Sequence, residues 1–588
     1  MIATIAFLMF CTSAVAAPKK KESDLGKRRQ ALRDLLHENW EYTLKESPEF
    51  ASILGDKRWN DQLSDFSQET IDRQLMEAKK FLVRFEAIDT AGFPEQERLN
   101  QTLMVRSLRN EVEDARFKSW RMPVNQMNGI HIDAPQLGSL LQFNTSKDYD
   151  DYIARLQKLP IVIDQTITQM RKGMAEGLVP PRFLLEKVAE QTAGIAALKG
   201  DRSPFAQSLQ TMPKTISESD QTRLRTQLVA AVNQAVIPAY RKFEKFVREE
   251  YAPRGRTDMG VWSLPEGAAR YANAAQRRTT TNLTPEEIHA IGLREVADLE
   301  RQMLIIARKL GHTDLKSFNA SLEKNPALRP TSRENILEIY RARIAAMEKK
   351  LPQLFGRLPK AGMKVMQVEE FRENGASGAQ YQRPAQDGSR PGFIMVNTRD
   401  YQNRKTISFE STAYHEGVPG HHLQIAIAQE LPELPPFRAQ GGYTAFVEGW
   451  ALYSERLGKD VGFYKDPYSD YGRLQDEMLR AIRLVVDTGL HSKKWTREQV
   501  VQFFRDHSAI DEVEIQSETD RYIVWPGQAL AYKIGQLKIL ELRERAKKDL
   551  GKRFDIRDFH DAILGAGALP LDVLEERIDR WIATKKKG

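Results

Sequence analysis

The chain has 588 residues, of which 41% are hydrophobic and 29% charged, a balance typical of a water-soluble globular protein and not of a disordered or membrane-spanning one. This length exceeds what one hydrophobic core usually organises, so roughly two to four domain-sized units, or one large helical body, are expected. The formal net charge of +8 arises from 88 basic and 80 acidic residues, which are spread along the chain without long blocks of one sign. That distribution argues against nucleic acid as the main partner.

The N-terminal residues have the pattern of a secretory signal. Ile2–Phe10 is a short apolar run, and Ala14-Val15-Ala16 places small residues where a signal peptidase cuts. The run is shorter than the ~20 apolar residues that a membrane-spanning helix needs, and no later stretch reaches that length. We therefore expect residues 1–16 to be removed, leaving a periplasmic or secreted protein without stable membrane insertion.

Cys11 is the only cysteine of the chain, and it lies within the predicted signal. Phe10 before it is too large for a lipoprotein processing site, so a lipid anchor is not expected. The mature chain then has no disulfide and no thiolate metal ligand. Any transition-metal site must be built from histidine and carboxylate side chains, which suit a catalytic zinc ion.

The first half of the chain is predicted to be helical. Amphipathic periodicity recurs from about residue 25 to residue 251, as in the segment 151–177, where leucine and isoleucine follow at steps of three and four. The Pro/Gly/Arg-rich stretch 252–256 breaks this pattern. It predicts a boundary between a helical scaffold half, residues 17–253, and a catalytic half, residues 254–588.

The second half mixes helices with short strands. Thr284-Pro285-Glu286-Glu287 has the residues of a helix start, with a capping threonine, a proline in the first turn and a glutamate at the third helical position. Short β-branched runs bounded by turn residues predict two strands. Helices are predicted at 284–310, 332–350, 443–457, 468–487, 496–504 and 528–548, and strands at 365–368 and 392–398. The predicted fold is mainly α: a large, bilobed helical body with a small β-sheet beside the active-site helix.

Three of the ten histidines fall within eight consecutive residues, His415-Glu416-Gly417-Val418-Pro419-Gly420-His421-His422. The familiar zinc helix has two histidines four apart and a glutamate directly after the first, but the residue four after His415 is Pro419. The distal histidines follow at steps of six and seven. On an undistorted helix a step of six points roughly 120° away, and a step of seven lies about 10 Å further along the axis.

Pro419-Gly420 is suited to distort the helix, since proline lacks a backbone donor and glycine tolerates unusual torsions. We therefore predict a bulged metal helix that brings one distal histidine back towards His415. The spacing leaves both His421 and His422 open as the second ligand.

Three motifs together resemble a known family: the segment 415–422, Phe446-Val447-Glu448-Gly449-Trp450-Ala451-Leu452-Tyr453-Ser454-Glu455, and Arg521-Tyr522-Ile523-Val524-Trp525-Pro526-Gly527-Gln528-Ala529-Leu530-Ala531-Tyr532-Lys533-Ile534-Gly535. They look like the bacterial family catalogued as domain of unknown function 885, which is grouped with zinc peptidases. The likeness covers most of the mature chain. More distantly, the layout is similar to thimet-oligopeptidase-like gluzincins, in which a His-Glu-x-x-His helix precedes a helix carrying Phe-Val-Glu.

The resemblance implies a metal-ligand set. Glu448 matches the third ligand of the Phe-Val-Glu helix, and His415 matches the first ligand. In the resembled enzymes a glycine directly precedes the second ligand histidine, which favours His421 over His422 after a two-residue insertion. The implied cofactor is Zn²⁺, and two imidazoles with one carboxylate leave a fourth position open for water.

The catalytic roles follow from the same resemblance and from the residue types. Zinc lowers the pKa of a bound water towards ~7, and Glu416 would take its proton as general base. The resembled peptidases supply a phenol or imidazole from a downstream helix to stabilise the oxyanion. Tyr532, with Tyr522 in reserve, is the candidate for that role.

Other polar residues could support the ligands. Glu455 follows Glu448 by seven residues, on the same helical face, and could orient a ligand histidine. Asp487 and His491 could play similar parts. The other histidines have no ligand spacing and are expected to be structural or on the surface: His37, His131, His289, His312, His507 and His560.

The predicted function is a secreted zinc-dependent peptidase that acts on short peptides. The predicted strand 392–398 could pair with an extended peptide, and Arg383 or Arg521 could hold a substrate carboxylate. One alternative is a metal-dependent amidase or esterase acting on a non-peptide substrate. Another is a non-catalytic peptide-binding or metal-carrying protein on a peptidase scaffold, against which the general base Glu416 argues. The sequence does not predict an oligomeric state.

Overall fold

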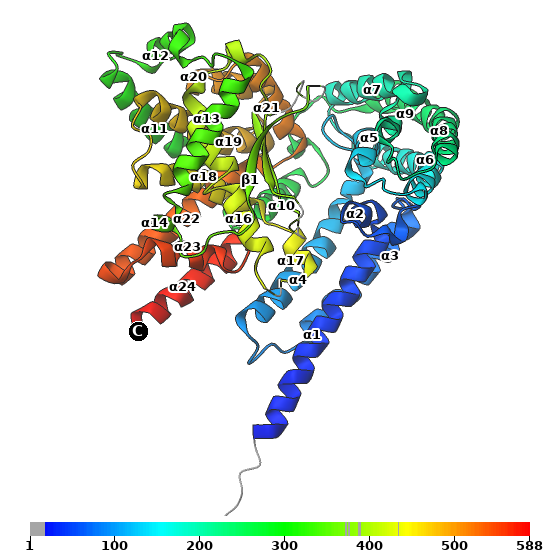
Figure 1. Cartoon of the computed structure of the whole chain (residues 1–588), viewed down its shortest axis with the longest axis horizontal. Coiled ribbons are helices and arrows are strands. Elements are labelled where there is room, and N and C mark those ends of the chain that lie inside the picture. The colour runs from blue at the N-terminus through cyan, green and yellow to red at the C-terminus, as the bar shows by residue number, and fades with distance from the viewer. Residues whose placement is uncertain are drawn as a thin grey trace, which may run out of the picture. The chain divides into compact units, whose positions relative to one another are not determined.

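The computed structural model describes residues 18–587 except 371–372, 374–376, 386–387, 389 and 433, so the predicted signal lies outside the described residues. The fold is mainly α-helical with one small sheet (Figure 1), which confirms the predicted fold class. The chain forms two compact units, one from the residues up to Ser47 with Gln68–Arg116, the other from Pro48–Ser67 with the chain from Phe117 onward. The division into scaffold and catalytic halves, and the bilobed body, stay predictions.

The smaller unit is built from three helices, α1 (Pro18–Glu46), α3 (Gln68–Glu86) and α4 (Glu95–Asp114). Phe85 of α3 and Leu103 of α4 are buried between them. Arg29 of α1 donates to both carboxylate oxygens of Glu97 on α4, at 2.8 and 2.6 Å. Apolar packing and a two-pronged ion pair therefore hold this unit together.

The larger unit begins with a helical region whose core lies between Val124 and Ala252. The periodic apolar residues of the segment predicted at 151–177 are buried there, from Leu156 to Ile167. A capping box at Thr145 starts the long helix α6. The helices of this region are α2 (Pro48–Ile53), α5 (Ile130–Leu140), α6 (Ser146–Ala175), α7 (Arg182–Ala197), α8 (Glu218–Ala231) and α9 (Ile237–Phe246).

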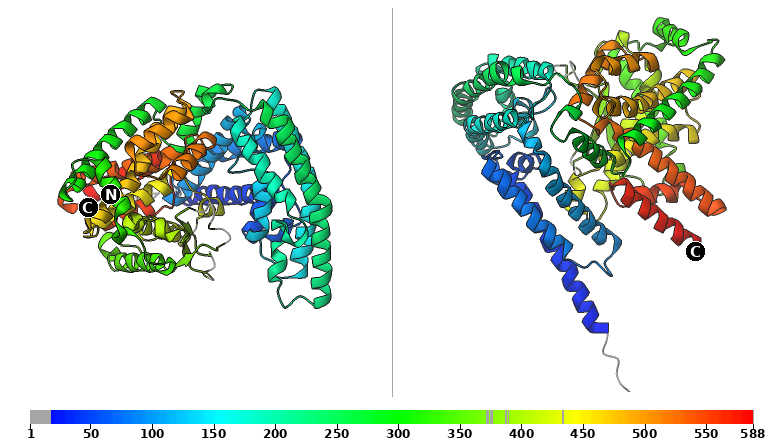
Figure 2. Two further views of the ribbon diagram at one scale, coloured as in Figure 1. Left: turned by 90° about the horizontal axis from the view of Figure 1, so that it is seen from above. Right: turned by 180° about the vertical axis from the view of Figure 1, so that it is seen from behind.

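A second core of the larger unit contains α11 (Pro285–Lys309) and α19 (Pro467–His491). Thr284 and Glu287 form the predicted capping box, which confirms that helix start. In the views of Figures 1 and 2, α22, α23 and α24 lie side by side near the C-terminus. The remaining helices around this core are α10 (Gly267–Thr279), α12 (Leu315–Lys324), α13 (Arg333–Glu348), α14 (Leu351–Leu354), α20 (Arg497–His507), α21 (Glu512–Val524), α22 (Ala531–Leu550), α23 (Ile556–Leu564) and α24 (Leu571–Lys587).

The sheet has the strand order β1-β3-β2, from β1 (Met363–Gln367), β2 (Ala379–Gln382) and β3 (Gly392–Val396). β3 pairs in parallel with β1 and antiparallel with β2. The prediction that the strand at 392–398 pairs with a substrate peptide is wrong, because both edges of β3 are already occupied. In the described part of the chain, β2 is paired on one side only.

The predicted metal helix is broken rather than bulged. α15 (Phe409–Glu416) ends and α16 (His421–Gln429) begins on either side of a four-residue turn, in which the Val418–Pro419 peptide bond is cis. A Cβ at Gly420 would collide with the carbonyl oxygen of His415, so the chain turns back too tightly for one continuous helix. The bulge prediction is therefore wrong, although the proline and glycine do interrupt the helix.

The next two helices of this region are α17 (Pro436–Gln440) and α18 (Thr444–Asp460). α18 holds the turn between α15 and α16, since Trp450 Nε1 donates to the carbonyl oxygen of Pro419 at 2.9 Å. On its other side α18 crosses α22 closely, because a Cβ at Gly449 would collide with Gly535. The turn, α18 and α22 are thus fixed against one another.

Candidate metal centre

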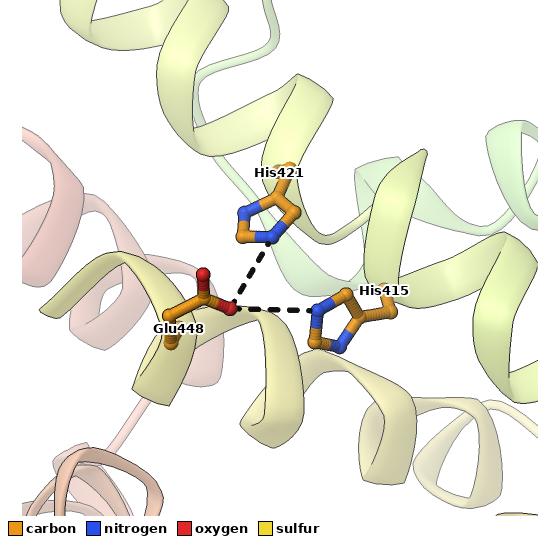
Figure 3. Close-up of side chains that lie close together, drawn as sticks. All are labelled: His415, His421 and Glu448. Atoms are coloured by element: carbon orange, nitrogen blue, oxygen red, sulfur yellow. Dashed lines mark ion pairs between the residues drawn. The ribbon is translucent and has the colours of Figure 1, made fainter. Parts of the chain in front are cut away.

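Three side chains converge from three helices: His415 from the end of α15, His421 from the start of α16 and Glu448 from α18 (Figure 3). One nitrogen or oxygen atom from each lies within 4.8 Å of the other two. Glu448 Oε2 is 3.7 Å from His415 Nε2 and 3.6 Å from His421 Nε2.

These separations suit a metal better than hydrogen bonds. Hydrogen bonds between nitrogen and oxygen span roughly 2.7–3.2 Å. Two ligand atoms on a tetrahedral zinc ion, each about 2.05 Å from the metal, lie about 3.4 Å apart. The side chains of His415, His421 and Glu448 are 6, 11 and 20% exposed, so the site is enclosed but still open to a small ligand. The donor set fits zinc.

Glu455 fixes the ring of His415. Its Oε1 lies 2.8 Å from His415 Nδ1, and its side chain is only 3% exposed. Glu455 and Glu448 stand two turns apart on α18, one on each side of the imidazole. The Nδ1 nitrogen is therefore held by a carboxylate while Nε2 is presented to Glu448, an arrangement that commonly orients a metal-binding histidine.

The ring of His421 lacks close partners. Among the described residues, its Nδ1 is buried without a hydrogen-bond partner, and its Nε2 only faces Glu448 at 3.6 Å. The ring meets that of His415 edge to face, with centroids 4.8 Å apart. Nε2 faces the Glu448 carboxylate beyond hydrogen-bond length, which leaves this nitrogen available to a cation.

His422 points elsewhere. Its Nδ1 accepts from the hydroxyl of Tyr381 on β2 at 3.0 Å, and its Nε2 donates to the carbonyl oxygen of Ala361 at 3.1 Å. Both ring nitrogens are therefore used. The structure places His421, and not His422, beside His415 and Glu448, and Tyr381 was not recognised because β2 has no β-branched residues.

The electrostatics of the site favour a positive charge. Burial lowers the pKa of His415, but the carboxylates of Glu448 and Glu455 outweigh it and raise this pKa to about 10. Burial opposes the ionised form of Glu448, yet His415 and His421 hold its pKa well below the usual range. In the absence of a metal, a proton on His415 offsets the carboxylates, and a divalent cation would take over that role.

Glu416, the predicted general base, is the last residue of α15 and is partly exposed. Burial raises its pKa, Glu448 raises it further, and His415, His421 and Arg480 lower it. A raised pKa brings the carboxylate closer to the operating range of a proton acceptor at neutral pH.

Tyr532 lies at the start of α22, one turn before Gly535. Its hydroxyl accepts from Arg521 Nη2 at 3.3 Å, and its ring lies 4.6 Å from the guanidinium carbon of Arg483. Among the described residues, no hydrogen bond joins it to the three converging side chains. Tyr522 is fully buried, and its hydroxyl donates to Glu518 and accepts from Arg483.

Asp487 and His491 do not support a ligand histidine, so that hypothesis is wrong. Asp487 accepts from the Tyr271 hydroxyl at 2.6 Å and from the Gly527 amide at 3.0 Å. His491 Nδ1 accepts from the Val261 amide at 3.1 Å, and its Nε2 donates to the backbone carbonyl of residue 522 at 2.9 Å. These contacts tie α19 to neighbouring segments. The exposed Arg383 contacts Gln440 at 3.3 Å.

Residues 48–578 match the family described as bacterial protein of unknown function (DUF885). The chain belongs to this family. The predicted membership is thereby confirmed, while the wider similarity to gluzincins and thimet-oligopeptidase-like enzymes stays a prediction.

Two solved structures share the fold. A crystal structure of a "putative lipoprotein" from Colwellia psychrerythraea superposes with a TM-score of 0.89 at 32% identity, covering 95% of this chain and 99% of that one. A "putative lipoprotein of unknown function" from Shewanella oneidensis gives a TM-score of 0.74 at 18% identity, with 94% and 99% covered. The second likeness concerns the fold alone. Among curated proteins no relative matches the chain.

Within the described residues, no helix combines the length and apolar character that crossing a bilayer requires. The periplasmic or secreted location stays a prediction, since the signal on which it rests lies outside the described residues.

Proposed function

We propose that this protein is a zinc-dependent peptidase in which His415, His421 and Glu448 hold the metal. The observation that supports it most strongly is the convergence of two imidazole nitrogens on one carboxylate oxygen at 3.6 and 3.7 Å. Glu455, which fixes the ring of His415 at 2.8 Å, adds the outer partner that such ligands usually have. The gluzincin-like order of the motifs along the chain agrees with this assignment.

When bound, zinc supplies a Lewis acid and lowers the pKa of a water ligand. Glu416 then takes a proton from the attacking water and returns it to the leaving amine. Its place next to His415 at the helix end, and its raised pKa, suit both transfers. His415 and His421 act as neutral ligands, with Glu455 accepting the remaining N–H of His415.

The sheet supports a peptide as the substrate. β2 has one unpaired edge in the described part of the chain, and an extended peptide can add to such an edge through its main chain. Tyr381 of β2 is stacked near His421, with ring centroids 6.5 Å apart, so this edge runs beside the ligand set. We therefore propose that the substrate peptide pairs with β2 and not with the strand at 392–398.

The test is hydrolysis of a peptide library by the zinc-loaded full chain, followed by mass spectrometry, for the wild type and Glu416→Gln. Loss of a general base should slow cleavage roughly 10²- to 10⁴-fold while zinc stays bound. Glu338→Gln, an exposed glutamate of α13, is the matched control and should cut at the wild-type rate.

Equal cleavage by Glu416→Gln, or a zinc-loaded wild type that cuts no peptide, would overturn the proposal. Hydrolysis of simple amides or esters without any peptide cleavage would instead favour the amidase or esterase alternative.

A further inference from the structure

We propose that a row of three arginines beside the metal centre, Arg480, Arg483 and Arg521, binds the free C-terminal carboxylate of the peptide. The enzyme would then remove residues from C-terminal ends rather than cut within chains. This inference rests on the proposed peptidase function. The three residues are called the arginine row below.

The arginine row starts at the metal centre. Arg480 lies on α19, which packs against α15 and α18, and its Nη2 is 3.9 Å from Oε1 of Glu455, the carboxylate that holds His415. Arg480 is therefore adjacent to the carboxylate that supports His415.

From there the row continues along α19 and across to α21. Arg483 follows Arg480 by one turn, about 4.5 Å along the helix axis. Arg483 and Arg521 share the carboxylate of Glu518, at 2.8 and 3.1 Å. Arg521 also donates to the hydroxyl of Tyr532, which lies one turn before the crossing of α22 with α18. The row thus ends at α22, the helix that crosses α18 at Gly449 and Gly535.

The arginine row has unused hydrogen-bond donors. A guanidinium offers five N–H groups, but Arg480 makes one short bond, from Nη1 to the carbonyl oxygen of Asp476 at 2.9 Å. The carboxylates nearest to it, Glu455 and Asp476, are both 3.9 Å away. Among the described residues, the Nε atoms of Arg480 and Arg521 are buried without a partner. The N–H groups that Arg480 does not use leave it able to bind a further acceptor.

The positive charge of the arginine row favours binding of an anion. Arg483 and Arg521 share the carboxylate of Glu518, and the carboxylates near Arg480 lie 3.9 Å away. The side chains of Arg480 and Arg521 are 16 and 17% exposed, against 6% for Arg483, so a ligand can reach the two outer arginines. Planar guanidinium groups match a carboxylate in two-pronged geometry.

The surrounding acids favour a monoanion over a phosphate. Asp476, Glu455 and Glu514 stand near Arg480 and offset part of its charge, so a dianion would meet more repulsion than a carboxylate.

The test uses two N-acetylated peptides of identical sequence, one ending in a free carboxylate and the other in an amide. For the zinc-loaded full chain, kcat/KM should be roughly 10- to 100-fold higher for the carboxylate form, as expected when a charged hydrogen-bonding partner is lost. In Arg480→Gln and in Arg521→Gln this ratio should fall towards one.

Arg473→Gln is the matched control. Arg473 also lies on α19 and is 6% exposed, but it pairs with Asp470 and Glu477 at 2.9 and 3.2 Å. Its substitution should leave the ratio at the wild-type value. A merely structural role for the row would lower cleavage of both peptides equally and leave the ratio intact.

Equal cleavage of the two peptides by the wild type would overturn the inference and leave the proposed function standing, as would an unchanged ratio in folded Arg480→Gln and Arg521→Gln. If one of the two variants does not fold, the ratio for the wild type and the ratio for the other variant still test the inference. If no peptide is cut at all, the proposed function fails, and this inference fails with it.

Discussion

The protein contains buried histidines in two opposite environments. His560 is hydrogen-bonded to uncharged groups: its Nδ1 donates to the carbonyl oxygen of Leu354 at 2.8 Å, and its Nε2 accepts from the Tyr453 hydroxyl at 2.8 Å. Burial lowers its pKa to about 3. His415 is equally deep, but the carboxylates of Glu448 and Glu455 lie on both sides of its ring and raise its pKa to about 10.

The contrast shows that burial alone does not identify a functional histidine. Both nitrogens of His560 are used by uncharged partners, so nothing is left for a metal. In the candidate metal centre, Nε2 of His415 and Nε2 of His421 face a carboxylate at 3.7 and 3.6 Å, too far for hydrogen bonds. A nitrogen that remains free while facing a charge is the distinguishing feature.

The largest expected effect separates two adjacent histidines. His421→Ala removes one of the three proposed ligands, so zinc should be lost on dialysis and hydrolysis should fall at least about 100-fold. His422→Ala breaks bonds to Tyr381 and Ala361 and should cost about 1–3 kcal/mol of stability, with zinc retained. Elemental analysis and hydrolysis rates check both variants. Retention of zinc by His421→Ala, with loss by His422→Ala, would reverse the assignment.

A smaller effect is expected for Glu455, the carboxylate that contacts His415 Nδ1. Glu455→Gln keeps the shape of the side chain but removes the charge that holds His415 Nδ1 at 2.8 Å. Zinc affinity should weaken roughly 10- to 100-fold, measured by competition with a chromophoric chelator. An unchanged affinity would mean that the ring of His415 needs no orienting carboxylate.

The sequence was enough to predict the parts of the metal centre that depend on local pattern. The cluster at 415–422 and the glutamate of the Phe446–Glu455 segment predicted three residues that the structure brings together. The choice between His421 and His422 stayed open from spacing, because it depends on where the helix breaks and on Tyr381. That tyrosine lies on β2, whose Ala-Gln-Tyr-Gln sequence has no strand pattern.

Predictions that depend on local pattern succeeded, whereas predictions that depend on how helices pack against one another failed. The capping residues at Thr284 predicted a helix start correctly, since capping is local. The residue types of Asp487 and His491 suggested that they support a ligand histidine. Periodicity does not tell which face of their helix meets the site, because residues 481–491 are buried on every side. The local pattern predicted β3 as a strand, but its central place in the sheet depends on pairing with β1 and β2.

Substitution of His560 is expected to lower the free energy of unfolding without changing zinc binding. His560→Ala removes two buried hydrogen bonds and leaves a cavity, so the free energy of unfolding should fall by roughly 2–4 kcal/mol. Zinc stoichiometry should not change. Urea unfolding in parallel with elemental analysis gives both quantities, and a loss of zinc at unchanged stability would remove the distinction between the two environments.

A final effect is expected in the pH dependence of stability. The folded protein keeps His560 neutral down to a pKa of about 3, whereas the unfolded chain binds a proton below about pH 6.5. Stability is therefore lost as pH falls from about 6.5 towards 3, by at most about 1.4 kcal/mol per pH unit for this residue. His560→Asn should flatten that slope in urea unfolding between pH 6.5 and 4, and an unchanged slope would contradict the assigned environment.

X-ray absorption spectroscopy of the zinc-loaded wild type tests the central claim most directly. We predict one zinc per chain, bound by two imidazole nitrogens and by oxygen at about 2.0–2.1 Å, with one imidazole lost from the spectrum of any zinc that His421→Ala retains. A chain that binds no zinc, or zinc whose spectrum contains no imidazole, would contradict the account.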